Sequence, residues 1–230
     1  MKTYNALLEG LQDPNIFKAF FLAGGPGSGK SYVAGKTTGG TGLVTVNSDD
    51  AFEIMLAKEG LSAKMPKDET EARDVVRKRA KVLTGKKKEG LIAGRLGLII
   101  DGTGKDHGKV IQQSNSLKQI GYDTHMIFVN TSLDVALARN AERQRSVEDS
   151  IATHSWKNVQ SNMGKFSQHF RGNIVIVDNN NVMQDDGMLF NDIFKQIKSL
   201  LKIKVRNPKA HAWVSQQMKE RGITRKPKGW

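Results

Sequence analysis

The 230-residue chain has no cysteine. Disulfide bonds, thiolate metal sites and a cysteine nucleophile are therefore excluded. No stretch of the sequence comes near the 18 consecutive apolar residues that a membrane-spanning helix requires, and residues 1–9 lack the apolar core of a secretory signal peptide. We therefore expect a cytoplasmic protein with no membrane partner.

Acidic residues are also scarce relative to basic ones. The chain has 23 Asp and Glu against 36 Lys and Arg, which gives a net charge of +13 at pH 7. Such an excess favours a nucleic-acid partner, because cationic side chains release the counterions that surround the phosphates. The alternative is a charge excess that serves only solubility. The five histidines are scattered without the spacing of metal ligands.

The chain does contain a glycine-rich segment with a phosphate-binding pattern. Residues 24–31 read Gly-Gly-Pro-Gly-Ser-Gly-Lys-Ser, follow the apolar run 19–23 and match G-x-x-x-x-G-K-[ST], the P-loop. Backbone N–H groups of such a turn face inward, and the following helix adds its positive end. Lys30 would reach the β- and γ-phosphates, and the Ser31 hydroxyl would bind Mg²⁺. We therefore predict nucleoside triphosphate binding by Gly25, Pro26, Gly27, Ser28, Gly29, Lys30 and Ser31.

Five short apolar segments that alternate with helical patterns predict the fold. We expect strands at about 17–23, 43–46, 96–101, 124–129 and 173–178. Helices between consecutive strands imply right-handed crossovers and a three-layer α/β fold with a five-stranded, mainly parallel sheet. A long helix is expected from Asp68, with one apolar face formed by Ala72, Val75, Val76, Ala80 and Leu83.

The composition changes after Lys202. Residues 202–230 hold nine Lys and Arg against a single acidic residue, Glu220. We therefore divide the chain into a domain of residues 1–202 and a basic C-terminal tail, 203–230, with a short helix. Trp213 and Trp230 in the tail could stack on nucleic-acid bases, although packing is the commoner role for such a tryptophan.

Acidic and basic side chains follow the predicted strands at positions that suit phosphoryl transfer. Asp101 ends the third strand and is placed to hold Mg²⁺. Asp49 and Asp50 end the second strand, where a carboxylate can accept the proton of an attacking hydroxyl; helix capping is the alternative. Arg139 and Arg143 lie one turn apart after the fourth strand. They could neutralise charge on the transferred group, or simply form a solvated basic helix end.

Several of these motifs resemble a known family. The P-loop, Asn47-Ser48-Asp49-Asp50 and the run from Arg139 to Arg143, Arg-Asn-Ala-Glu-Arg, resemble the phage-type 5′-polynucleotide kinase domain. The stretch 98–103, Leu-Ile-Ile-Asp-Gly-Thr, running on to Gly121-Tyr122, is similar to the zeta-toxin kinases, a related group of P-loop kinases. The two resemblances together cover roughly residues 17–180.

The resemblance implies a P-loop kinase fold that uses ATP and Mg²⁺. It implies that Lys30 and Ser31 contact phosphate and metal, that Asp49 or Asp50 is the general base, and that Arg139 and Arg143 are lid arginines. Thr103 would face the acceptor. The chain departs from the polynucleotide kinases after the Asp pair: their aromatic residue and phosphate-reading arginine are replaced by Ala51 and Phe52, with Glu53 next. A phage-encoded protein in the host cytoplasm is one interpretation.

We therefore expect a kinase that transfers the γ-phosphate of ATP to a hydroxyl group on a nucleic acid or nucleotide. One alternative keeps the chemistry but makes the acceptor a nucleotide sugar or another small metabolite, as in the zeta-toxin group. Another is a nucleotide-regulated nucleic-acid-binding protein with weak hydrolysis. No Asn-Lys-x-Asp guanine motif is present, which favours ATP over GTP.

Overall fold

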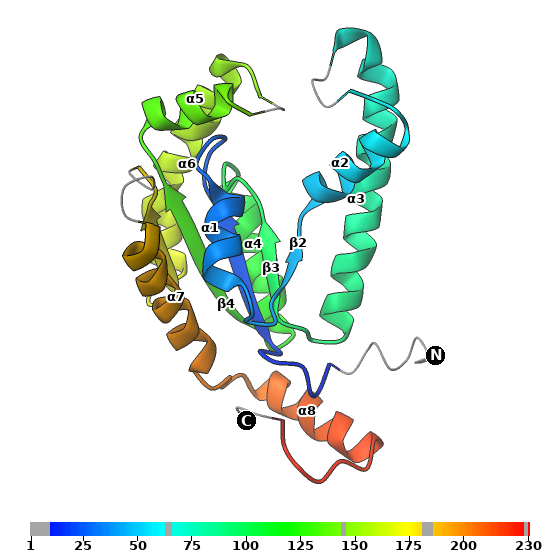
Figure 1. Cartoon of the computed structure of the whole chain (residues 1–230). Coiled ribbons are helices and arrows are strands. Elements are labelled where there is room, and N and C mark those ends of the chain that lie inside the picture. Colours follow the sequence, from blue (N-terminus) through cyan, green and yellow to red (C-terminus); the bar gives the residue numbers. More distant parts are fainter. Residues whose placement is uncertain (1–9, 63–65, 144–145, 181–185, 228–229) are drawn as a thin grey trace.

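Five parallel strands form the centre of the molecule, which is described here from a computed structural model. The structure describes residues 10–62, 66–143, 146–180, 186–227 and 230. The strands are β1 (Lys18–Ala23), β2 (Val44–Val46), β3 (Leu98–Asp101), β4 (Asp123–Asn130) and β5 (Ile174–Asp178), in the order β2-β3-β1-β4-β5 (Figure 1). Every pairing is parallel, which confirms the expected α/β sheet.

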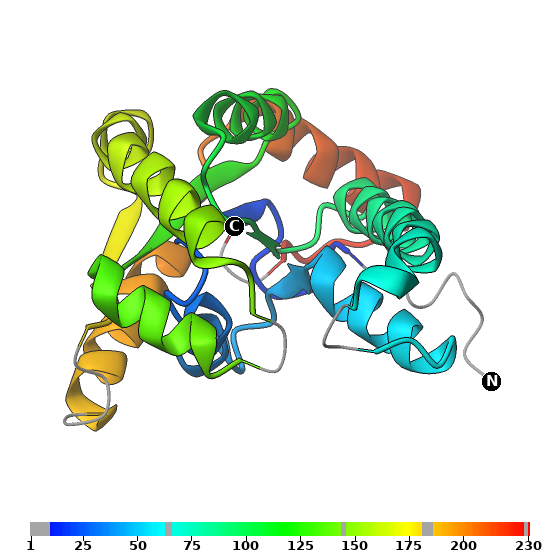
Figure 2. The same cartoon turned by 90° about the horizontal axis from the view of Figure 1, so that it is seen from above.

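Helices cover both faces of this sheet. Along the chain they are α1 (Lys30–Thr38), α2 (Ser48–Lys58), α3 (Thr70–Ala93), α4 (His107–Gln119), α5 (Leu133–Ala141), α6 (Asp149–His169), α7 (Asp186–Lys202) and α8 (Pro208–Glu220). A 3₁₀ turn, Lys67–Glu69, precedes α3. Seen from above, α5 and α6 lie on one side of the molecule and α2 and α3 on the other (Figure 2).

The central strand explains why the sheet needs two covering layers. All six residues of β1 are buried, and its side chains alternate between two cores. Phe20 and Leu22 pack in a core with residues of α1 and α7, whereas Phe21 and Ala23 pack in a core with residues of α4, α6 and α8. A parallel strand covered on both faces must be apolar throughout, so its sequence does not alternate.

The long helix α3 buries only part of its predicted apolar face. Val76 and Ala80 are buried in a small cluster with Phe52 and Leu56 of α2, but Val75 and Leu83 are 56% and 51% exposed. Ala72 is also exposed. The reason is that α3 packs mainly on α2 beyond the edge strand β2, so no second layer covers the rest of its apolar residues (Figure 1).

The C-terminal segment packs on the same core as the sheet. Val205, Ala210 and Val214 are buried there. The rings of Trp213 and Trp230 both contact Phe17, with centroids 5.4 and 5.6 Å away. Both tryptophans therefore have a packing role, which replaces the expectation that they stack on bases.

None of the helices in the described ranges combines the length and the apolar character needed to cross a membrane.

His125, in β4, is a buried polar residue with consequences for stability. Its side chain is 1% exposed and its ring stacks on Phe20 with a centroid separation of 4.7 Å. Neither ring nitrogen has a hydrogen-bond partner among the described residues. Burial, followed by the positive charges of Lys18 and Lys118, lowers the pKa of His125 from 6.5 to about 3. The folded protein therefore keeps this imidazole neutral.

We expect the protein to lose stability in acid because of His125. Below pH 6.5 the unfolded chain takes up a proton at this imidazole, while the folded protein does so only near pH 3. Stability therefore falls as the pH drops through this window, by about 2 kcal/mol between pH 7 and pH 4.5. Urea unfolding of wild type and His125→Leu at both pH values measures it. His125→Leu should lack this decrease in the free energy of unfolding. The control His154→Gln, which replaces an exposed histidine, should retain it. Equal losses in all three would contradict the assignment.

Candidate nucleotide and acceptor site

The P-loop joins β1 to α1 at the carboxyl end of the sheet, and its backbone is shaped around glycine. Gly27 and Gly29 have φ angles of 74° and 79°. A Cβ atom at Gly27 would overlap the carbonyl oxygen of Ala136, and one at Gly29 would overlap the side-chain amide of Asn179. Gly29 also serves as the N-cap of α1, and no side chain caps this helix. The first turn of α1 therefore offers its N–H groups to an anion.

Lys30 is partly buried at the floor of this loop. Its Nζ donates hydrogen bonds to the carbonyl oxygens of Gly24 (2.8 Å) and Gly25 (3.3 Å). Burial lowers the pKa of Lys30, and the nearby carboxylate of Asp101 opposes that effect. The ammonium group is thus held by neutral oxygens at a place where a phosphate would be a stronger partner.

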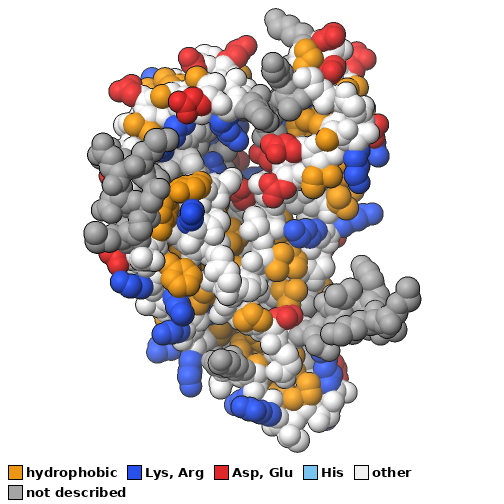
Figure 3. Space-filling model, in the orientation of Figure 1, with side chains coloured by type: hydrophobic (Ala, Val, Ile, Leu, Met, Phe, Trp, Pro, Cys, Tyr) orange, Lys and Arg blue, Asp and Glu red, His pale blue; other side chains and the backbone are white. Residues whose placement is uncertain are grey.

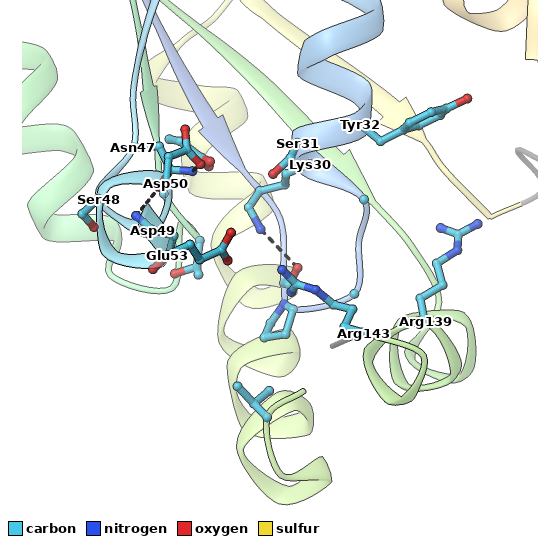
Figure 4. A pocket seen from close by; sticks show the side chains of 18 residues that line it. Lys30, Ser31, Tyr32, Asn47, Ser48, Asp49, Asp50, Glu53, Arg139 and Arg143 are labelled. Carbon is cyan, nitrogen blue, oxygen red and sulfur yellow. Dashed lines mark hydrogen bonds between the residues drawn. The ribbon is translucent and has the colours of Figure 1, made fainter. Parts of the chain in front are cut away.

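A cavity of about 700 Å³ opens above Lys30, within the usual size range of small-molecule sites. It is lined by backbone and side chains from the P-loop, from α2, from the end of β3 and from the region of α5 (Figure 4). The predicted site residues in its wall are Gly25, Pro26, Gly27, Gly29, Lys30, Ser31, Asp49, Asp50, Asp101, Arg139 and Arg143.

Ser28 is the predicted P-loop residue that does not line the cavity. It is fully buried, and its hydroxyl has no hydrogen-bond partner among the described residues. Its carbonyl oxygen accepts a hydrogen bond of 2.7 Å from Nδ2 of Asn179. Ser28 therefore belongs to the support of the loop.

The residues present fit a triphosphate and Mg²⁺. The glycine cradle, the open helix start and the partly buried ammonium group are the donors that phosphate oxygens require. The Ser31 hydroxyl and the Asp101 carboxylate, which line the same cavity, are the hard oxygen ligands that Mg²⁺ prefers. Burial raises the pKa of Asp101 and the positive charge of Lys30 lowers it, while Asp49 and Asp50 raise it further.

Asn47 positions the two carboxylates that line the cavity opposite the P-loop. It is the N-cap of α2: its Oδ1 accepts from the backbone N–H of Asp49 (2.8 Å), and its Nδ2 donates to Oδ1 of Asp50 (2.9 Å). The capping role that the sequence left open for the two aspartates thus falls to Asn47. Both aspartates lie in the first turn of α2, where the helix dipole favours negative charge.

Asp49 is held by a residue that the sequence did not single out for the site. The Arg77 guanidinium, from α3, lies 2.9 Å from Oδ1 of Asp49 and rests over the ring of Phe52 at 3.8 Å. Phe52 occupies the position at which the polynucleotide kinases, which this sequence resembles, carry an arginine. The contact of Arg77 could have been found only from the pairing of α2 with α3, whereas Glu53 lies one helical turn after Asp49 and Asp50 on α2.

The two arginines near α5 make different contacts. Arg139, on α5, donates to the carbonyl oxygens of Asn179 (2.7 Å) and Asn180 (3.4 Å), in the loop after β5. Arg143 follows the end of α5 and extends toward Lys30 and the P-loop (Figure 4). Its charge contributes to the lowered pKa of Lys30. Arg143 therefore faces the site of the phosphates, whereas Arg139 ties α5 to the loop after β5.

Two further residues support the P-loop from outside the cavity. The amide of Asn179 joins the end of β5 to Ser28. Trp156, on α6, lies against Gly25, and its Nε1 donates to the carbonyl oxygen of Thr131 at 2.8 Å. Asn179 could have been noticed in the sequence, because polar residues that end a parallel strand gather at the ligand-binding edge.

Comparison with known proteins decides the family. The model of the zeta toxin family matches residues 8–187. The chain belongs to the zeta-toxin family, which is a family of P-loop kinases. No curated protein sequence matches the chain.

Solved structures with the same fold include a candidate kinase and two chains of one complex, all at low sequence identity. A candidate kinase of Chloroflexus aurantiacus aligns with a TM-score of 0.53 and 17% identity over 82% of this chain and 98% of its own. A chain of the AvrRxo1-ORF1:ORF2 complex with ATP aligns with a TM-score of 0.52 and 17% identity, over 75% of this chain and 61% of its own. A chain of the same complex in its native form aligns with a TM-score of 0.52 and 16% identity, over 94% of this chain and 83% of its own. At these identities the likeness shows the fold.

We expect that replacing glycine by alanine weakens ATP binding within the P-loop but not farther along α1. Gly27→Ala should weaken ATP binding at least tenfold, because its Cβ would displace the loop from Ala136 and because its φ is positive. Gly35→Ala is the matched control: it lies within α1 with no atom near its Cβ, and it should gain about 0.5–1 kcal/mol of stability. Calorimetric ATP titration and urea unfolding measure both effects. Unchanged ATP binding by Gly27→Ala would contradict the cradle.

Proposed function

We propose that this zeta-toxin-family protein is an ATP-dependent kinase that transfers the γ-phosphate to a hydroxyl acceptor, with Mg²⁺. One observation carries the proposal: a single cavity has the P-loop and Lys30 on one wall and the carboxylates of Asp49, Asp50 and Asp101 on the other. A donor phosphate and an acceptor hydroxyl can therefore meet within one cavity.

The P-loop wall would hold the phosphates. The glycine cradle and Lys30 would bind the β- and γ-phosphate oxygens, and Ser31, together with Asp101 from the opposite wall, would hold the metal. When bound, Mg²⁺ would neutralise charge on the phosphate oxygens. Arg143 would stabilise the negative charge that develops on the transferred group, while Arg139 keeps α5 in place over the nucleotide.

The opposite wall would activate the acceptor. The hydroxyl oxygen bonds to the γ-phosphorus as the bond to the β-phosphate oxygen breaks, so that ADP leaves. The hydroxyl proton passes to a carboxylate, for which Asp49 and Asp50 are the candidates. Asn47 and Arg77 orient these two side chains. Thr103, at the end of β3, lines the same wall and would face the acceptor.

Two acceptor classes are each supported by an observation. The net charge of +13 and the Asn-x-Asp-Asp segment support a hydroxyl of a nucleic acid or nucleotide. The local charge of the acceptor wall supports a small metabolite instead. The lining residues that α2 and the end of β3 contribute include four carboxylates, Asp49, Asp50, Glu53 and Asp101, and no Lys or Arg among the described ones.

Transfer should depend on both walls. Lys30→Ala should abolish it, and the double variant Asp49→Asn/Asp50→Asn should abolish it while ATP still binds. The measurement is transfer of label from γ-labelled ATP to a panel of 5′-hydroxyl oligonucleotides, nucleosides, sugar nucleotides and free sugars, with calorimetry for ATP. A double variant that transfers label at the wild-type rate would refute the assignment of the base. Label on an oligonucleotide supports the first acceptor class, and label on a sugar compound supports the second.

The two arginines should differ in kinetics. Arg143→Ala should lower kcat on the order of 100-fold with a small change in the KM for ATP, since its role is in the transition state. Arg139→Ala should mainly raise the KM for ATP, because it frees α5 from the loop after β5. Steady-state kinetics of ADP formation with any acceptor that becomes labelled will separate the two. Identical effects of both substitutions would contradict the division of roles.

A further inference from the structure

The positive charge of the chain is concentrated in two segments: residues 77–95, with eight Lys and Arg against one acidic residue, and the C-terminal end. Residues 193–230 contain eleven Lys and Arg and one acidic residue, Glu220. This segment therefore carries +10 of the net charge of +13, and residues 1–192 are close to neutral at +3. A charge excess that served only solubility would have no reason to gather in two segments of the sequence.

The fold places this segment at the end of the sheet opposite the cavity. The Nζ of Lys18, at the first residue of β1, donates to the carbonyl oxygen of Ile203. Trp213, in α8, packs on Phe17, directly before β1. Helix α8 therefore lies at the amino ends of the strands, whereas the P-loop lies at their carboxyl ends (Figure 1).

Four cations lie close together where α7 passes into α8. Lys202, Lys204, Arg206 and Lys209 are all exposed, and none forms an ion pair with a described residue. We call these four residues the basic turn. Between them Val205 and Ala210 are buried, and Nδ2 of Asn207 donates to the carbonyl oxygen of Lys118 at 2.9 Å. The core therefore fixes the backbone of this turn, so that its cations extend into solvent.

The two ends of the molecule differ in charge. Acidic side chains gather around the hollow at the cavity end, and Lys and Arg side chains gather over α7 and the start of α8 (Figure 3). The acidic side chains of the acceptor wall would repel a long polyanion, whereas the cations over α7 and the start of α8 would attract it.

Among polyanionic surfaces, a nucleic acid fits better than a membrane. A helix that binds a membrane surface inserts an apolar face, but the apolar face of α8, with Ala210 and Val214, is buried in the core. Ile203 is the only large apolar side chain in the described part of this segment that is clearly exposed. Trp213 and Trp230 pack on Phe17, so the contacts would be to phosphates and would not depend on base sequence.

We infer that the basic turn, with the neighbouring cations of α7 and α8, is a binding surface for the phosphate backbone of a nucleic acid, separate from the kinase cavity. This surface attaches the protein to a nucleic acid regardless of which acceptor the cavity uses. Its existence does not rest on the kinase activity.

The test is the salt dependence of binding to a fluorescein-labelled 20-base-pair DNA duplex of arbitrary sequence, measured by anisotropy from 25 to 200 mM KCl. The full-length wild type should bind with a linear relation between log K and log [KCl]. The variant Lys202→Gln/Lys204→Gln/Arg206→Gln/Lys209→Gln should bind at least tenfold more weakly at 100 mM KCl. Its slope should be smaller by about three to four, since each phosphate that the protein no longer neutralises removes roughly 0.9 from the slope.

The matched control is Lys58→Gln/Lys78→Gln/Lys81→Gln/Lys86→Gln, which removes the same number of exposed charges from α2 and α3. It should change the slope by less than one. Equal losses in both variants would show a general effect of net charge and would overturn the inference, as would no binding by the wild type at 25 mM KCl. Stronger binding to phosphatidylserine vesicles than to DNA at 100 mM KCl would also overturn it. Circular dichroism and calorimetric ATP titration, both expected to be unchanged in the two variants, check the fold and keep this result separate from failure of the kinase proposal.

Discussion

The partly buried ammonium group of Lys30 is the constraint on which the site depends. A cation that has lost part of its hydration must be compensated by nearby oxygens, and here the carbonyl groups of Gly24 and Gly25 and the carboxylate of Asp101 supply them. Those carbonyl groups can reach Nζ only because the glycine-rich backbone turns back over the start of α1. The loop, the lysine and the acidic end of β3 therefore form one electrostatic unit, and a triphosphate would replace weak neutral partners by strong charged ones.

Other parts of the fold hold this unit in place. The Asn179 amide bonds to Ser28, and the guanidinium of Arg139 bonds to the carbonyl oxygen of Asn179, so the loop after β5 connects the P-loop to α5. Trp156 supports the loop from α6. On the other wall, Asn47 and Arg77 orient the aspartates from α2 and α3. Asp49 and Arg139 are thus positioned by partners from other elements, Arg77 of α3 and the residues after β5.

The sequence predicted the sheet and the P-loop because both depend on local patterns. Short apolar runs with helical segments between them are sufficient for parallel strands, and the glycine spacing is sufficient for the loop. Apolar spacing alone could not tell that Val75 and Leu83 on α3 stay exposed, because that depends on whether another layer exists beyond β2. The contacts of Arg77 and Asn179 were not predictable for a similar reason: both join segments far apart in the chain. Arg139 and Arg143 are four residues apart, a spacing that would place them on one face of a helix. Their side chains nevertheless point in different directions, because α5 ends at Ala141, between them.

The charge distribution follows from the same architecture. The carboxyl ends of parallel strands collect the helix N-termini and the loops that handle phosphate, and in this chain they also collect the acidic residues that would act on the acceptor. A phosphate backbone close to that wall would meet repulsion from four carboxylates. Cations that attract a polyanion can therefore accumulate without interfering with the cavity only at the opposite end of the strands, where α8 lies. Separation of the two charged surfaces along the strand axis lets one small domain combine an acidic acceptor wall with a basic surface, because interactions between exposed charges are screened within about 8 Å at physiological salt.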